Sequence, residues 1–103
     1  MKPQTLTVKT RSTPVVEMDT EAGAAYVRFK RAKVERTISR EGPGPIVAVD
    51  LDATNQVIGV ELIGVKVFNL PTLLRQSAIR APHIDPALTR YIRASKHEVQ
   101  PAE

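Results

Sequence analysis

The chain has 103 residues, of which 42% are hydrophobic, and its 15 Lys and Arg against 11 Asp and Glu give a net charge of +4. This length is typical of one small domain. The absence of cysteine excludes disulfides, thiol catalysis and cysteine-based metal sites. No apolar run approaches the ~20 residues of a membrane span and no signal-peptide core opens the sequence. We therefore expect a cytoplasmic protein with no membrane partner and no cofactor.

The first two thirds of the chain are rich in Val and Ile, which suit strands. The alternation of apolar residues predicts strands at 15–18, 24–30, 33–39, 46–50 and 57–65. A short connection at Arg31 and Ala32 predicts a hairpin between the second and third strands, with Val34 and Ile38 on their shared apolar face. Arg36 does not fit this pattern, because the alternation along the strand places it on the same apolar face as Val34 and Ile38. The Gly/Pro run at 41–45 predicts a turn, and Asn55 is the expected positive-φ residue of the last hairpin.

The C-terminal part predicts helix. Asn69 or Thr72 can cap a short helix that runs to about Ala78, and Asp85 followed by Pro86 is a second start signal. Strands followed by helices indicate an α+β fold, namely an antiparallel β-meander of about five strands with one or two short C-terminal helices. The second helix is expected to pack through three residues at i, i+3 and i+4, which are Leu88, Tyr91 and Ile92.

We expect four segments in chain order. Residues 1–14 form an N-terminal arm, 15–68 the sheet, 69–95 a helical segment packed on the sheet and 96–103 a disordered tail. The hairpin at 46–65 is apolar on both faces, and the helical segment can bury only one of them. A second copy of the chain is the simplest cover for the other, so we expect a homo-oligomer, with a dimer as its simplest form.

The positive charge is concentrated between residues 28 and 40, where a single acid, Glu35, accompanies six basic residues. On a two-stranded ribbon these side chains form a candidate interaction surface for an acidic protein partner. Nucleic acid is the alternative, because cations on a ribbon can follow phosphates. A solvated strand pair that resists aggregation uses the same residue types. The six residues are Arg28, Lys30, Arg31, Lys33, Arg36 and Arg40.

Acidic residues near the last hairpin suggest a second candidate site. The spacing from Asp50 through Asp52 to Glu61 approaches a calcium loop, but Thr54 and Asn55 replace the expected ligand and glycine. Asp50 and Glu61 can also be read as a metal-binding or paired-carboxylate site on neighbouring strands. The competing interpretation is a polar turn held by Asx hydrogen bonds.

The two histidines offer little for catalysis. Asp85 could orient His83 as a base, yet no Ser lies in a nucleophile elbow, and His97 is in the tail. Capping by Asp85 and a solvated His83 is the competing interpretation. We expect a non-catalytic interaction module.

Three blocks of sequence, at 18–29, 46–52 and 57–63, resemble the prokaryotic family described as domain of unknown function 2283. The resemblance extends over residues 15–65. Gly23 stands where that family usually has Asp, and Asn55 where a turn glycine is common. The resemblance implies a compact β-meander domain with no established activity. Because some members are encoded beside toxin-like genes, it also implies an antitoxin-type partner role.

Overall fold

Strands dominate the chain, in line with its β-branched composition. The structure is a computed structural model that describes residues 5–19, 21–40, 46–64 and 68–93. The large sheet contains β2 (Val15–Asp19), β3 (Ala24–Arg28), β4 (Arg36–Arg40), β5 (Ile46–Leu51), β6 (Val57–Ile63) and β8 (Arg90–Arg93). The remaining elements are β1 (Leu6–Thr7), α1 (Leu70–Gln76), β7 (Ile79–Arg80) and a 3-10 turn, Pro86–Leu88.

The strands of the large sheet lie in the order β4-β5-β6-β3-β2-β8. All neighbours are antiparallel except β2 and β8, which are parallel. β4, β5 and β6 form a meander, and β3 returns beside β6, which is a Greek-key arrangement. The expected α+β class with a mostly antiparallel sheet is therefore confirmed, although the sheet has six strands rather than about five.

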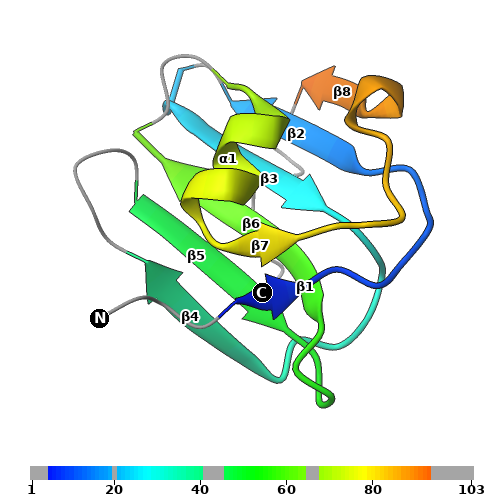
Figure 1. Cartoon of the computed structure of the whole chain (residues 1–103). Coiled ribbons are helices and arrows are strands. Elements are labelled where there is room, and N and C mark those ends of the chain that lie inside the picture. Colours follow the sequence, from blue (N-terminus) through cyan, green and yellow to red (C-terminus); the bar gives the residue numbers. More distant parts are fainter. Residues whose placement is uncertain (1–4, 20, 41–45, 65–67, 94–103) are drawn as a thin grey trace.

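One face of the sheet is covered by α1 and by the parallel pair β1 and β7 (Figure 1). Val27, Val49 and Val60 lie opposite one another on β3, β5 and β6 and have no exposed surface. They belong to the same buried cluster as Leu70 and Leu73 of α1. Asn69 caps α1, with its side chain accepting from the Thr72 amide at 2.9 Å, as the sequence predicts. The helical segment thus supplies the expected cover for this face.

The opposite face, which we call the open face, carries the alternate residues of the same strands. No described helix or strand lies over it (Figure 1). Ile46 and Ile63 are directly opposite each other there and are 52% and 47% exposed. Ala48 is paired with Glu61 across β5 and β6, and the expected positive φ of Asn55 is confirmed, at 65°. A register shift beside Leu51 brings Val57 into the buried cluster.

The hairpin expected between the second and third strands does not form. β6 occupies the place beside β3, and β4 lies at the sheet edge with β5 and β6 between it and β3. β6 needs the central position because its first four residues are all buried. β4 suits an edge, since Arg36 is opposite buried Leu51 yet remains exposed there. Val34 precedes β4 and is 45% exposed instead of packing on the apolar face.

The prediction of a second helix is also wrong, because only a 3-10 turn forms before the chain becomes extended. Asp85 caps the 3-10 turn by accepting from the Ala87 amide at 3.0 Å, but Thr89 is already extended. β8 follows and pairs with the edge of β2, whose backbone groups would otherwise lack partners on that side. Tyr91 and Ile92 are therefore 54% and 38% exposed, although the Tyr91 ring meets Phe68 edge-on at 6.0 Å.

Some expectations fall on residues outside the described ranges. These are the turn at 41–45 and the tail at 96–103, with His97. None of the described helices is both long enough and apolar enough to cross a bilayer.

Candidate interaction surface

The structure disperses the six basic residues of the 28–40 segment over two separate strands and the connection between them. Arg28 on β3 forms an ion pair with Glu17 of β2 at 3.1 Å. Arg36 on β4 donates from Nε and Nη2 to Asn55 Oδ1, at 3.1 and 2.7 Å. Arg31 and Lys33 are exposed in the connection, and Arg40 lies at the end of β4. The prediction that these residues lie together on one two-stranded ribbon is therefore wrong.

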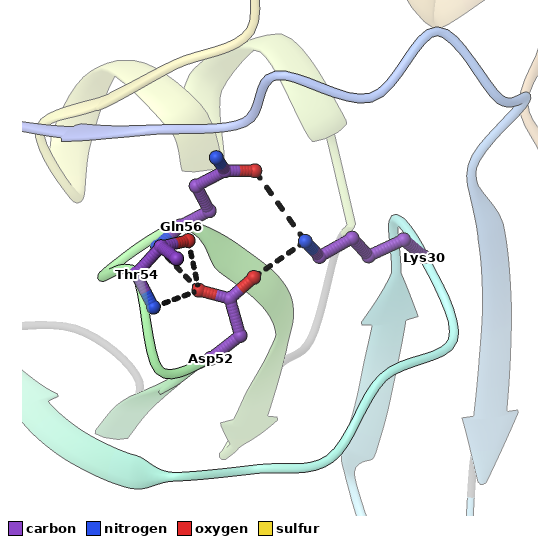
Figure 2. Close-up of polar contacts among 4 residues, drawn as sticks. All are labelled: Lys30, Asp52, Thr54 and Gln56. Carbon is purple, nitrogen blue, oxygen red and sulfur yellow. Dashed lines mark hydrogen bonds and ion pairs between the residues drawn. The ribbon is translucent and has the colours of Figure 1, made fainter.

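Lys30 belongs to a polar cluster that fixes the turn between β5 and β6 (Figure 2). Its ammonium contacts Asp52 Oδ2 at 2.5 Å and Gln56 Oε1 at 3.4 Å. The other Asp52 oxygen accepts from the Thr54 amide at 2.8 Å, the Thr54 hydroxyl at 2.7 Å and the Gln56 amide at 3.0 Å. The Asx-type turn is confirmed, and its sequence signal was the D-x-T-N run. Lys30, 22 positions away, had no signal that linked it to Asp52.

This cluster shifts the titration of its carboxyl group. The hydrogen bond from the Lys30 ammonium is the largest cause, and the Gln56 amide and the Thr54 hydroxyl add to it. Together they hold the pKa of the Asp52 carboxyl well below its usual range. The calcium-loop interpretation makes Asp52 a ligand of a metal ion. In the structure the Lys30 ammonium contacts this carboxylate instead.

We expect Asp52 to make the fold sensitive to acid. Its pKa is lower in the folded chain than in the unfolded chain, so its stabilising effect is present above about pH 4 and is lost as the pH falls further. The Asp52→Asn variant should be less stable at pH 7, and its stability should change less between about pH 4 and pH 2 than that of the wild type. Urea denaturation at a series of pH values measures both quantities.

The matched control for this experiment is Lys30→Met, which removes the largest cause of the shift and keeps the carboxylate. Its stability should depend on acid less steeply than the wild type and more steeply than Asp52→Asn. Equal acid dependence in the wild type and Asp52→Asn would contradict the assignment.

Asp50 and Glu61 both lie on the open face, but Asp50 is already engaged. The Tyr26 hydroxyl donates to Asp50 Oδ2 at 3.0 Å, and the Thr37 hydroxyl donates to Oδ1 at 2.7 Å. Burial, followed by the negative charge of Asp50, raises the pKa of the Tyr26 hydroxyl well above its usual value. Tyr26 therefore stays a hydrogen-bond donor. The structure brings Tyr26 and Thr37 to Asp50, which sequence reasoning missed.

Gly59 makes this contact possible. It is the β6 residue paired with both Asp50 and Arg28, and the Tyr26 side chain occupies the space that a Cβ of residue 59 would need. A Cβ at this position would lie within 2.6 Å of Tyr26 Cζ. The sequence signal was a lone glycine inside a strand pattern, which often marks a close approach.

The remaining candidate groups stay apart. The Asp85 carboxylate accepts a hydrogen bond from the 3-10 turn, and His83 is exposed in the preceding loop. The capping interpretation is therefore confirmed. Over residues 5–19, 21–40, 46–64 and 68–93, no group of three or more His, Cys, Asp or Glu is placed to hold a metal ion. The Asp50, Asp52 and Asp85 carboxylates are thus each engaged with donors of the same chain.

Comparison with known proteins adds no further constraint. Neither a protein-family model, nor a curated protein, nor a solved structure matches the chain. The resemblance to domain of unknown function 2283 therefore stays a prediction.

Proposed function

We propose that this protein is a non-catalytic, cytoplasmic interaction module that forms a homodimer through its open face. The observation that carries the proposal is the pair of isoleucines at one end of that face. Ile46 and Ile63 are cross-strand neighbours with about half of each side chain exposed. Exposed apolar side chains that adjoin one another mark association surfaces more often than single ones do.

Two acidic residues of the open face fit the same proposal, whereas Glu61 is exposed on that face and has to stay in contact with water in a dimer. Asp50 accepts from two hydroxyls, and Glu17 is paired with Arg28. Burying a polar group costs little when its hydrogen bonds are already made, whereas an unpaired charge is expensive to bury. Two such faces can therefore pack together as sheets do in a sandwich, with the internal pairs kept. The same engagement of Asp50 argues against a catalytic carboxylate.

The dimer can be tested by analytical ultracentrifugation at micromolar concentration. We expect the wild type to sediment with twice the chain mass and the double variant Ile46→Glu/Ile63→Glu to sediment as a monomer. The matched control is Leu88→Glu, because Leu88 is 63% exposed on the 3-10 turn. This control should remain dimeric. A monomeric wild type, or a dimeric double variant, would contradict the proposal.

The antitoxin-type role that the resemblance implies is one form of such association. Nucleic-acid binding through residues 28–40 gains no support from the fold, because Arg28 and Arg36 lie on strands separated by β5 and β6. Adjacent strands are about 4.8 Å apart, so these two strands are about 14 Å from each other.

A further inference from the structure

β8 is the edge strand of the large sheet beside β2 and pairs with it in parallel (Figure 1). All four residues of β8 are exposed. In the described part of the chain, Ile84 is the last residue that packs against the buried cluster. None of the described residues that follow it, 85–93, is buried. β8 thus adds backbone hydrogen bonds to the fold but little buried apolar surface.

The strand to which β8 is attached is anchored from its other side. β2 pairs with β3 along all five of its residues, and its Val16 side chain is completely buried. Segments with few buried apolar contacts open at a lower free energy than the core of the same domain. β8 and β2 therefore differ in local stability although they are neighbours in the sheet.

Two local features oppose the docked conformation of residues 85–93. Asp85 followed by Pro86 is a helix start signal, yet the chain is extended again at Thr89. A conflict between a local signal and the adopted structure weakens a segment. In addition, the Thr89 hydroxyl oxygen is buried without a hydrogen-bond partner in the described ranges. A buried polar group of this kind costs free energy that contact with water restores.

We propose that residues 85–93 form a detachable strap, which leaves β2 and rebinds to it while the rest of the fold stays intact. Ile84 is the fixed end of the strap, because its side chain packs on the buried cluster. Release makes β2 the edge strand and exposes the outer amide and carbonyl groups of Val15–Asp19. The strap thus switches the edge of β2 between a covered and an exposed state. This inference goes beyond the proposed function and does not require the dimer.

Native-state hydrogen exchange of the full chain tests the strap with two matched amides. The Arg90 amide donates to the Pro14 carbonyl at 3.0 Å, and the Phe29 amide donates to the Ile58 carbonyl in the core of the sheet at 2.8 Å. We expect the protection factor of the Arg90 amide to be at least about a hundredfold lower. Its exchange should depend little on urea, because release exposes little apolar surface. Equal protection, or an equally steep urea dependence, would overturn the proposal.

A reversible disulfide can lock the strap. Val15 and Arg90 are paired neighbours, and adjacent strands lie about 4.8 Å apart, which a disulfide can span. The chain has no cysteine, so Val15→Cys/Arg90→Cys forms one defined bridge, and the reduced form of this variant is its control. Oxidation should slow exchange of the β8 amides by at least about tenfold more than exchange of the Phe29 amide. Equal slowing of both would mean that β8 opens only when the whole domain unfolds, which would overturn the proposal.

Two further measurements separate the strap from the dimer. Release is intramolecular, so exchange of the Arg90 amide should not change when the protein is diluted. The double variant Ile46→Glu/Ile63→Glu should keep the same difference between the Arg90 and Phe29 amides, even if the wild type proves to be a monomer. Faster exchange of the Arg90 amide on dilution would assign its opening to the dissociation of subunits and would overturn the strap.

Discussion

The Phe29→Ala variant is expected to lose about 3–5 kcal/mol of the free energy of unfolding. Phe29 directly follows β3, is 1% exposed, and is among the largest fully buried side chains in the described ranges. Its amide donates to the Ile58 carbonyl at 2.8 Å, which fixes its backbone against β6. Removal of the ring from the buried cluster leaves a cavity that the surrounding residues fill only in part. Small domains are stable by about 5–15 kcal/mol, so this single change removes a large part of the total.

Urea denaturation followed by circular dichroism measures the loss. Val34→Ala is the control, because Val34 lies five positions further along the chain and is 45% exposed. Its stability should stay within about 0.5 kcal/mol of the wild type. A loss of less than about 1 kcal/mol in Phe29→Ala would show that the core is packed differently.

Gly59→Ala is expected to be the most disruptive of the small substitutions. The added methyl group would meet the Tyr26 ring and would lie 2.7 Å from the Val27 carbonyl oxygen of the neighbouring strand. Alanine stiffens the unfolded chain, which stabilises by about 0.4–1 kcal/mol. Overpacking costs about 1–3 kcal/mol, and displacement of Tyr26 from Asp50 costs about 1 kcal/mol more. The steric cost therefore prevails.

A double-mutant cycle with Tyr26→Ala tests the cause. Removal of the ring relieves only part of the clash, since the Val27 carbonyl belongs to the backbone of β3. The loss caused by Gly59→Ala should therefore be smaller in the Tyr26→Ala background but not zero. Strict additivity of the two losses would contradict a direct contact between Tyr26 and residue 59.

The β5–β6 hairpin and α1 could be predicted from the sequence because their signals are local. Asn55 tolerates the left-handed conformation that the turn requires, and Asn69 followed by Pro71 marks a helix start. Each of these signals acts over a few residues, so no knowledge of the rest of the chain is needed.

The neighbour of β3 could not be predicted from local signals. The alternation of apolar residues in β3 is compatible with either β4 or β6 as its neighbour. Only the burial of the two candidate strands distinguishes these arrangements. Two features pointed to the observed order. Arg36 at an inward parity suits an edge strand, and the uninterrupted apolar run at the start of β6 is typical of a strand buried on both faces.

The candidate interaction surface also differs from the prediction, because it depends on the same strand order. The six basic residues of the 28–40 segment were predicted as one ribbon because they are close in sequence. The insertion of β6 and β5 between β3 and β4 leaves Arg28 paired with Glu17 and Lys30 paired with Asp52. The hydrogen bonds of Asp50 with Tyr26 and Thr37 likewise join three strands that only the folded sheet brings together.

The sequence by itself thus determined the fold class, the main turn and the helix cap, since these depend on the conformational preferences of neighbouring residues. The tertiary structure alone decided the strand order, the conversion of the expected second helix into β8, and the pairing of Arg28 with Glu17 and of Lys30 with Asp52. Those outcomes depend on burying apolar surface and pairing edge strands across the whole molecule, and sequence proximity does not report either process.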